Sequence, residues 1–234
     1  MTKKNWTIAK LNLRNIKAAY FVTGLLVALM VSQIVVNVVL AVKGYNMENN
    51  TGVSLGWFLW MAVILAAILI PGRNFSRIVN LGGKRSSFFW GSLMTHTVLS
   101  GAASLVGTIL YYSLDRMMFT SGKFGYMLSA PDVFGWAAHG PIAVILQQFA
   151  FLLLFATFVH TLSAAQGKWY GYAADIAIIA VISVFTPIAP LRAAEAWFFR
   201  LILFSQPLLQ IPACLVLAMA VYKLNGPIMA RKAI

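Results

Sequence analysis

The sequence predicts an all-α membrane protein with six transmembrane helices and both termini in the cytoplasm. Three observations support this prediction. The 234 residues are 61% hydrophobic and only 10% charged, whereas soluble domains carry roughly 25% charged residues. Six stretches contain no Asp, Glu, Lys or Arg, and an α-helix needs about 20 apolar residues to cross a hydrocarbon core of about 30 Å. The basic residues fall mainly on alternate connections. The charge-free stretches are residues 18–42, 49–72, 86–114, 133–167, 176–191 and 201–222.

The distribution of basic residues predicts the orientation. Thirteen of the 18 Lys and Arg residues precede the first stretch, occupy the 73–85 connection, stand at position 168 or lie in the C-terminal tail. Because short connections rich in Lys and Arg remain in the cytoplasm, both termini are expected inside, which requires an even number of spans. A nucleic-acid partner is not expected, since the basic residues are spread between spans instead of forming one basic face.

The N-terminal residues 3–17 mix Trp6, Leu13 and Ile16 with five basic residues. Their spacing predicts an interfacial helix on an anionic leaflet, and a plain basic flank of the first span explains the same residues equally well. The following apolar run, Ala18–Val42, is longer than the apolar core of a signal peptide. We therefore expect it to remain as the first span.

The remaining elements follow from apolar length and from helix-ending residues. Pro71 and Gly72 are expected to end the second span, and Asn74 to cap a short helix of about Phe75–Leu81. The segment between Pro187 and Pro207 predicts a short external helix or a re-entrant turn. Within a single transmembrane domain, 1–234, the spans are expected at about residues 18–42, 55–71, 88–112, 140–163, 169–190 and 201–223.

No catalytic or metal site is predicted. Four of the five acidic residues lie in segments expected outside, so membrane depth lacks paired carboxylates for acid and base chemistry. The fifth, Asp175, is expected to pair with Lys168 or Arg77. His96, His139 and His160 lack the i, i+4 spacing of a helix-borne metal pair. The patterns GxSxG and GxxxxGK[ST] are also missing, so the chain is expected neither to hydrolyse esters nor to bind nucleotide itself.

Polar side chains within the spans are the remaining clue, because unpaired amides and imidazoles are costly in lipid. They mark either a pathway for an amphipathic cargo or hydrogen bonds between helices. The candidates for lining a pathway are Gln33, Asn37, His96, Gln147, Gln148 and Gln206.

The six-span plan, the basic start and the segment NFSRIVNLGGKRSSFFWG resemble the permease subunits of bacterial ATP-binding cassette exporters. More narrowly, the chain is similar to small Gram-positive permeases that export, or give resistance to, antimicrobial and amphipathic peptides. In that family a pattern of the type (L/M)G-x-x-(R/K)-x-x-(F/Y)-(F/W) follows a short coupling helix. The corresponding places are occupied here by Leu81, Gly82, Lys84, Arg85, Phe88 and Phe89.

The resemblance implies that a separate ATPase subunit binds ATP and Mg²⁺, and that a second permease copy or a homologue completes the pathway. It implies an elbow helix at residues 3–17 and an external re-entrant element that contains Arg192 and Glu195. It also implies a coupling segment that inserts into a cleft of the ATPase. The coupling residues are Arg73, Asn74, Phe75, Arg77, Leu81, Gly82, Gly83, Lys84 and Arg85.

Three other functions fit the same sequence. The chain could be the substrate-binding membrane subunit of a small-molecule importer, which would bind a vitamin-sized ligand by itself. It could be an intramembrane enzyme that uses His96 or His160. It could also be a passive immunity or scaffold protein, which would protect cells without any ATPase.

Overall fold

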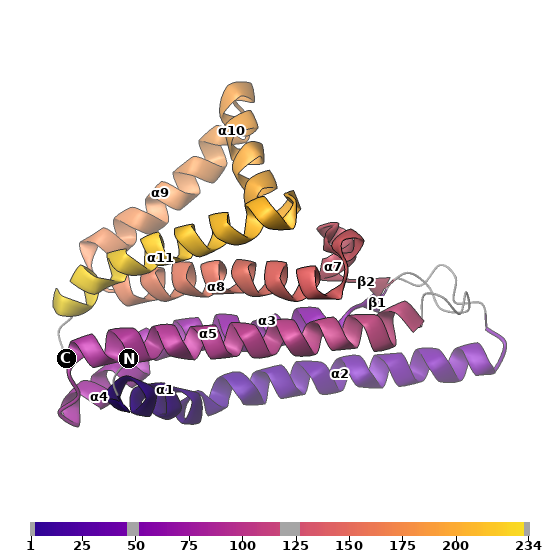
Figure 1. Cartoon of the computed structure of the whole chain (residues 1–234), viewed down its shortest axis with the longest axis horizontal. Coiled ribbons are helices and arrows are strands. Elements are labelled where there is room, and N and C mark those ends of the chain that lie inside the picture. The colour runs from indigo at the N-terminus through magenta and orange to yellow at the C-terminus, as the bar shows by residue number, and fades with distance from the viewer. Residues whose placement is uncertain (1–2, 46–51, 118–126, 232–234) are drawn as a thin grey trace.

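The computed structural model describes residues 3–45, 52–117 and 127–231, and these residues are almost entirely helical (Figure 1). Five helices are long and apolar enough to cross a membrane, and a sixth crossing is added if one bent pair of helices counts as a single span. The chain is therefore an all-α protein with the helix lengths of a membrane protein. The five are α2 (Lys17–Val42), Leu55–Asn80, Arg85–Asp115, α8 (Pro141–Ala165) and α11 (Pro207–Arg231).

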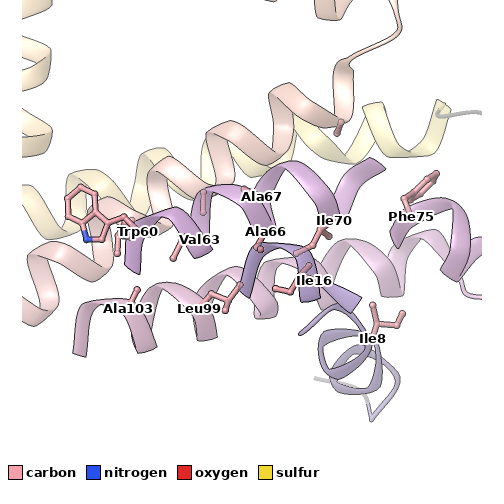
Figure 2. Close-up of a cluster of buried hydrophobic side chains, with 14 of the residues drawn as sticks. Ile8, Ile16, Trp60, Val63, Ala66, Ala67, Ile70, Phe75, Leu99 and Ala103 are labelled. Atoms are coloured by element: carbon pink, nitrogen blue, oxygen red, sulfur yellow. The ribbon is translucent and has the colours of Figure 1, made fainter. Parts of the chain in front are cut away.

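The centre of the molecule is a bundle of α3 (Leu55–Leu69), α5 (Arg85–Leu110), α8 and α11. α11 packs on α8, and α3, α5 and α8 pack on one another. Small side chains on α3, among them Ala66 and Ala67, are fully buried and let the neighbouring helices approach closely (Figure 2). Both the start of α1 (Lys3–Asn15) and the end of α11 lie at one end of this bundle, here called the termini end (Figure 1).

The N-terminal segment forms α1 and then turns at the buried Ile16 into α2. α1 packs on α5 through Ile8, Ala9 and Asn12, whereas Trp6 is 44% exposed. Ile16 is fully buried and Leu13 is partly buried against the core, so two of the three apolar residues of the predicted pattern face the bundle and Trp6 does not. α2 packs on α3 but buries only Ala19 and Thr23, so most of its apolar side chains face outward.

Pro71 and Gly72 do not end the second helix, contrary to the sequence prediction. The chain continues from α3 through a π-helical turn, η1 (Ile70–Asn74), into α4 (Phe75–Asn80). Pro71 has no N–H to donate, and the wider turn accommodates it while the Phe75 N–H bonds the Ile70 carbonyl. The Ser163 hydroxyl of α8 donates to the Ile68 carbonyl at 3.0 Å, as expected where a helix in lipid is distorted. Asn74 has helical φ and ψ and makes no capping bond.

α4 ends where the sequence places a reversal. Gly82 has a φ of +80°, its N–H bonds the Val79 carbonyl, and the next N–H, of Gly83, bonds the Ile78 carbonyl at 2.9 Å. This pair of bonds is a Schellman motif, which glycine favours because no Cβ opposes positive φ. α5 starts directly after this motif, at Arg85.

The other end of the bundle, here called the loop end, carries the longer connections, which contain short strands and helices (Figure 1). α5 runs into a second π-helical turn, η2 (Tyr111–Asp115), so this helix is longer than the predicted 88–112. β1 (Gly52–Val53) pairs in parallel with β2 (Met127–Leu128), and α7 (Ala130–Val133) and η3 (Trp136–His139) lead into α8. Gly122 and Gly125, expected to break regular structure here, lie outside the described residues.

The last third of the chain contains the bent pair. α9 (Trp169–Phe185) is followed by α10 (Ala189–Phe199) and the π-helical turn η4 (Arg200–Phe204), with a bend of 115° between the two arms. Figure 1 shows this pair leaving the bundle and returning to it at the start of α11. Residues 201–206, assigned to the sixth span by the sequence, belong instead to η4 and its turn. Pro207 starts α11, where the first helical position needs no N–H donor.

The close approach of α1 and α5 at Gly91 gives the first prediction. A Cβ at Gly91 would lie 2.6 Å from Ile8 Cγ2 and 3.0 Å from the Asn5 carbonyl oxygen. We expect Gly91→Ala to lower the free energy of unfolding in detergent by about 1–3 kcal/mol, because α1 must shift. Gly101→Ala, on the same helix, is the control: its Cβ meets only Phe149 at 4.0 Å, so stability should be unchanged or higher. Equal effects of both changes would contradict the close contact.

Candidate functional site

The predicted coupling residues divide into an outward set and an inward set. Arg73, Arg77, Leu81, Gly82 and Lys84 are exposed at the termini end, and the Leu81 side chain is 79% exposed. We call these five residues the basic surface. Of the inward set, Asn74 and Phe75 are buried, and Gly83 and Arg85 are half-buried.

Asn74 contributes to a buried network of hydrogen bonds. Its Nδ2 donates to Asn12 Oδ1 at 3.2 Å, and Asn12 Nδ2 donates to Ser92 Oγ at 3.3 Å and Thr95 Oγ1 at 3.4 Å. All four residues are buried, so each of these bonds also removes the cost of an unpaired buried amide. The network joins α1, the π-helical turn and α5 directly beneath the basic surface.

Arg85 joins the start of α5 to the end of α11. Its Nη1 donates to the Met229 carbonyl at 3.1 Å and also to the Ala230 carbonyl, while its guanidinium lies 5.8 Å from the centre of the Phe75 ring. The last carbonyls of a helix have no intrahelical partner and carry partial negative charge, so a guanidinium is well suited to them. Arg85 therefore fixes three helix ends to one another, and it is not part of the basic surface.

The predicted pathway residues do not gather around one cavity in the described structure. Gln33 is exposed and Asn37 half-buried on α2, and Gln206 is exposed just before α11. Gln147 Nε2 instead donates to Gln210 Oε1 at 2.6 Å, and Gln210 Nε2 donates to the Ile202 carbonyl at 2.9 Å. These bonds join α8, α11 and η4, as the helix-to-helix interpretation of buried amides expects.

A contact between His96 and His160 is not predicted from the sequence, but in the structure their imidazoles form a buried pair. His96 Nε2 and His160 Nδ1 lie 2.9 Å apart, so one ring N–H donates to the other ring nitrogen. Both rings are fully buried. Thr108 lies twelve residues after His96 on α5, and Gln148 lies twelve residues before His160 on α8. Thr108 Oγ1 donates to Gln148 Oε1 at 3.3 Å, so one antiparallel register of α5 and α8 makes both pairs.

On the side of α11, an aromatic ring lies beside the imidazole pair. The Tyr222 ring centre is 5.6 Å from that of His160, and the Tyr222 hydroxyl donates to the Phe89 carbonyl at 2.6 Å. His96 Nδ1 has no hydrogen-bond partner among the described residues. Sequence spacing alone does not reveal this pair, since its members are 64 positions apart and meet only through helix packing. Over the described residues, no three His, Cys, Asp or Glu side chains gather into a candidate metal site.

At the loop end, aromatic and acidic side chains fix the connections. Trp136 is fully buried and its Nε1 donates to the Leu203 carbonyl of η4 at 2.7 Å, so η3 fixes the returning arm of the bent pair. The buried Asp115 accepts a hydrogen bond of 2.5 Å from the Ser54 hydroxyl. Asp132 accepts bonds from Tyr111 and Ser129. The sequence places both acids in this region but does not indicate these partners.

The remaining predicted residues lie on the bent pair or beside it. Arg192 is exposed and Glu195 half-buried on α10. Asp175, expected to pair with Lys168 or Arg77, instead accepts two hydrogen bonds from the Gln166 amide, at 3.0 and 3.1 Å. The short turn between α8 and α9 brings that amide to the carboxylate, and the described contacts include no ion pair of Asp175.

Comparison of the chain with protein-family models, with curated proteins and with solved structures gives no match.

The Asn12–Asn74 contact gives the second prediction. We expect Asn12→Ala to lower the free energy of unfolding by about 1–3 kcal/mol, because the buried Asn74 amide is left unpaired. In the Asn12→Ala background, Asn74→Ala should lower the free energy of unfolding by less than it does in the wild type. The difference between the two effects, the coupling energy, should be about 0.5–3 kcal/mol. Chemical denaturation in mixed micelles measures all three variants.

Asn80→Ala is the matched control for this cycle, because Asn80 is exposed at the end of α4. Its effect should stay within about 0.5 kcal/mol. Strict additivity of Asn12→Ala and Asn74→Ala would contradict a direct hydrogen bond between the two amides.

Proposed function

We propose that this chain is the transmembrane subunit of an ATP-driven exporter that moves amphipathic or antimicrobial peptides, or related toxic compounds, out of the cell. The observation that carries the proposal is the basic surface, an exposed set of residues on a reversal that is bonded to three helices at the termini end. In this proposal the termini end faces the cytoplasm and the basic surface binds an ATP-binding cassette ATPase.

The basic surface has the mechanical properties that such a contact needs. Force from a partner reaches a membrane span only if the connection between them is stiff. Here α4 continues from α3 without a break, the Schellman motif fixes the reversal, and Arg85 fixes the start of α5 to the end of α11. A displacement of the basic surface would therefore move α3, α5 and α11 together.

The arrangement of helices supports an exporter of the resembled class. Five long apolar helices and one bent pair provide six crossings if α9 spans the membrane and α10 returns as an external re-entrant element. In this proposal six crossings place both termini on one side of the membrane, which agrees with α1 beginning and α11 ending at the same end of the bundle (Figure 1). In this proposal ATP and Mg²⁺ are bound by the partner ATPase, because the sequence carries no phosphate-binding loop.

A second permease copy or a homologue is part of the proposal. Within one copy, Gln147 and Gln148 bond to Gln210 and Thr108 and do not line an open path. Most apolar side chains of α2 and of the bent pair face outward. A cargo path between two copies reconciles these observations, with membrane lipid covering the apolar faces that do not meet the partner.

Orientation is tested by labelling single engineered thiols, the third prediction. Cys214 is the one cysteine and is buried, so a Cys214→Ala background removes it without exposing a new thiol. In intact cells, Arg77→Cys should resist a membrane-impermeant maleimide and react only after permeabilisation. Arg192→Cys should react without permeabilisation. Labelling of Arg77→Cys from outside would contradict the proposed cytoplasmic location of the basic surface.

Coupling to an ATPase gives the fourth prediction. In this proposal the basic surface faces acidic side chains of the ATP-binding cassette subunit. We expect the double change Arg77→Glu and Lys84→Glu to weaken association with that subunit by more than about tenfold, since the new carboxylates would then face like charges, which costs several kcal/mol. The association constant and the stimulated ATPase rate of the reconstituted complex are the measurements. Arg192→Glu is the matched control, because it reverses an exposed charge on α10, away from the basic surface.

The outcomes separate the competing functions. Export and ATPase association that survive the double charge reversal would contradict the proposal. Tight binding of a vitamin-sized ligand by the isolated chain would favour an importer subunit instead. A chemical activity that requires His96 and His160, and no ATPase, would favour an intramembrane enzyme.

A further inference from the structure

A groove of about 610 Å³ lies between α8, α9 and α11 at the termini end. Its walls are apolar: Phe158 and Leu162 come from α8, Ile178 from α9 and Leu224 from α11. Tyr170 and Arg231 also line it, and among the described residues Arg231 is the one charged side chain that does. A mostly apolar pocket of this volume with a few polar groups is typical of a small-molecule site.

The length of the groove matches half of a bilayer. Its lining residues on α11 run from Val221 to Arg231, and the ten steps between them rise about 15 Å along the helix axis. The hydrocarbon core of a bilayer is about 30 Å thick, so one leaflet contributes about 15 Å. Arg231 marks the end of the groove that would lie at the headgroup level.

The length of the groove distinguishes a lipid chain from a protein helix. A transmembrane helix of a second copy would extend over both leaflets, about 30 Å, whereas the groove extends over about 15 Å. The groove therefore matches an acyl chain of one leaflet better than a transmembrane helix.

The charge at the mouth of the groove selects the ligand. Arg231 is exposed in the last turn of α11, and Lys168 and Lys223 are exposed at the same end of the bundle. Asp175 is the only carboxylate on α9; it bonds to the Gln166 amide and does not line the groove. A guanidinium presents paired N–H donors that match the geometry of a phosphate, so an anionic headgroup is favoured here.

We propose that this groove binds an anionic phospholipid, with an acyl chain between α8, α9 and α11 and the headgroup phosphate at Arg231. The bound lipid fills the space between α9 and the bundle and holds the start of the bent pair in place. This site does not depend on the proposed export function, because it uses neither the basic surface nor an ATPase.

The test is a lipid titration of the purified full-length chain in detergent, with bound lipid counted by native mass spectrometry. Phosphatidylglycerol and phosphatidylcholine with identical acyl chains are compared. We expect the wild type to bind phosphatidylglycerol about fivefold more tightly, as one basic residue near a membrane surface contributes about 1 kcal/mol. Arg231→Gln should remove this preference, and it should weaken phosphatidylglycerol binding more than phosphatidylcholine binding, because the choline ammonium already neutralises the phosphate of phosphatidylcholine.

A second variant tests the acyl chain. Ala177 lines the groove, so Ala177→Trp should abolish tight binding of both lipids. Ile179→Trp is the matched control, because Ile179 is on the same helix, is 63% exposed and does not line the groove. If Ala177→Trp alters the circular dichroism or elution of the protein, Ala174→Leu, a smaller filling of the same groove, should weaken binding of both lipids.

Three results would overturn the proposal. Arg231→Gln could retain the full preference for phosphatidylglycerol, which would exclude a headgroup contact. Inorganic phosphate could displace the lipid at equal concentration, which would indicate an anion site without a chain. The groove-filling variants could leave lipid binding intact and change the oligomeric state, which would identify a second copy of the chain as the occupant.

Discussion

The structure depends on one constraint: a polar group inside a helix bundle with no water around it must find its partner on another helix. Each unpaired buried amide or imidazole would cost about 1–3 kcal/mol, and no hydrophobic gain between helices in lipid offsets that cost. Four buried polar side chains of α5 follow this rule. Ser92 and Thr95 meet Asn12, His96 meets His160, and Thr108 meets Gln148. These pairs fix the register of α5 against α1 and α8.

The same constraint explains how irregular backbone is tolerated in this bundle. Pro71 removes a donor in the middle of a long helix, the chain widens into a π-helical turn, and Ser163 of the neighbouring α8 donates to the Ile68 carbonyl. At the other end of the molecule, the Leu203 carbonyl of η4 accepts a bond from the Trp136 indole. In both places a side chain from another helix takes the role that water has in a soluble protein, and the distortion becomes a fixed part of the fold.

These bonds give the two ends of the bundle different properties. At the termini end, Asn74 and Arg85 are committed to other helices, so the exposed charges of Arg73, Arg77 and Lys84 stand on a rigid base. Next to it, α9 leaves the bundle and opens the groove that ends at Arg231. The stiff reversal at the termini end and the apolar groove between α8, α9 and α11 are distinct surfaces. The first supports the proposed contact with an ATPase, and the second the proposed lipid site.

The class of structure could be predicted from the amino-acid sequence, because apolar length and sparse charge are local properties. The long helices, the reversal at Gly82 and the break in the 187–207 segment were each indicated by a few neighbouring residues. The burial of Asn74, the contact of His96 with His160 and the bond between Gln147 and Gln210 could not be predicted in this way, and they appear only in the packed bundle. The physical reason is that the partner of a buried polar side chain is chosen by the register of two packed helices. That register is set by contacts between residues far apart in the chain, which the pattern along one helix does not contain.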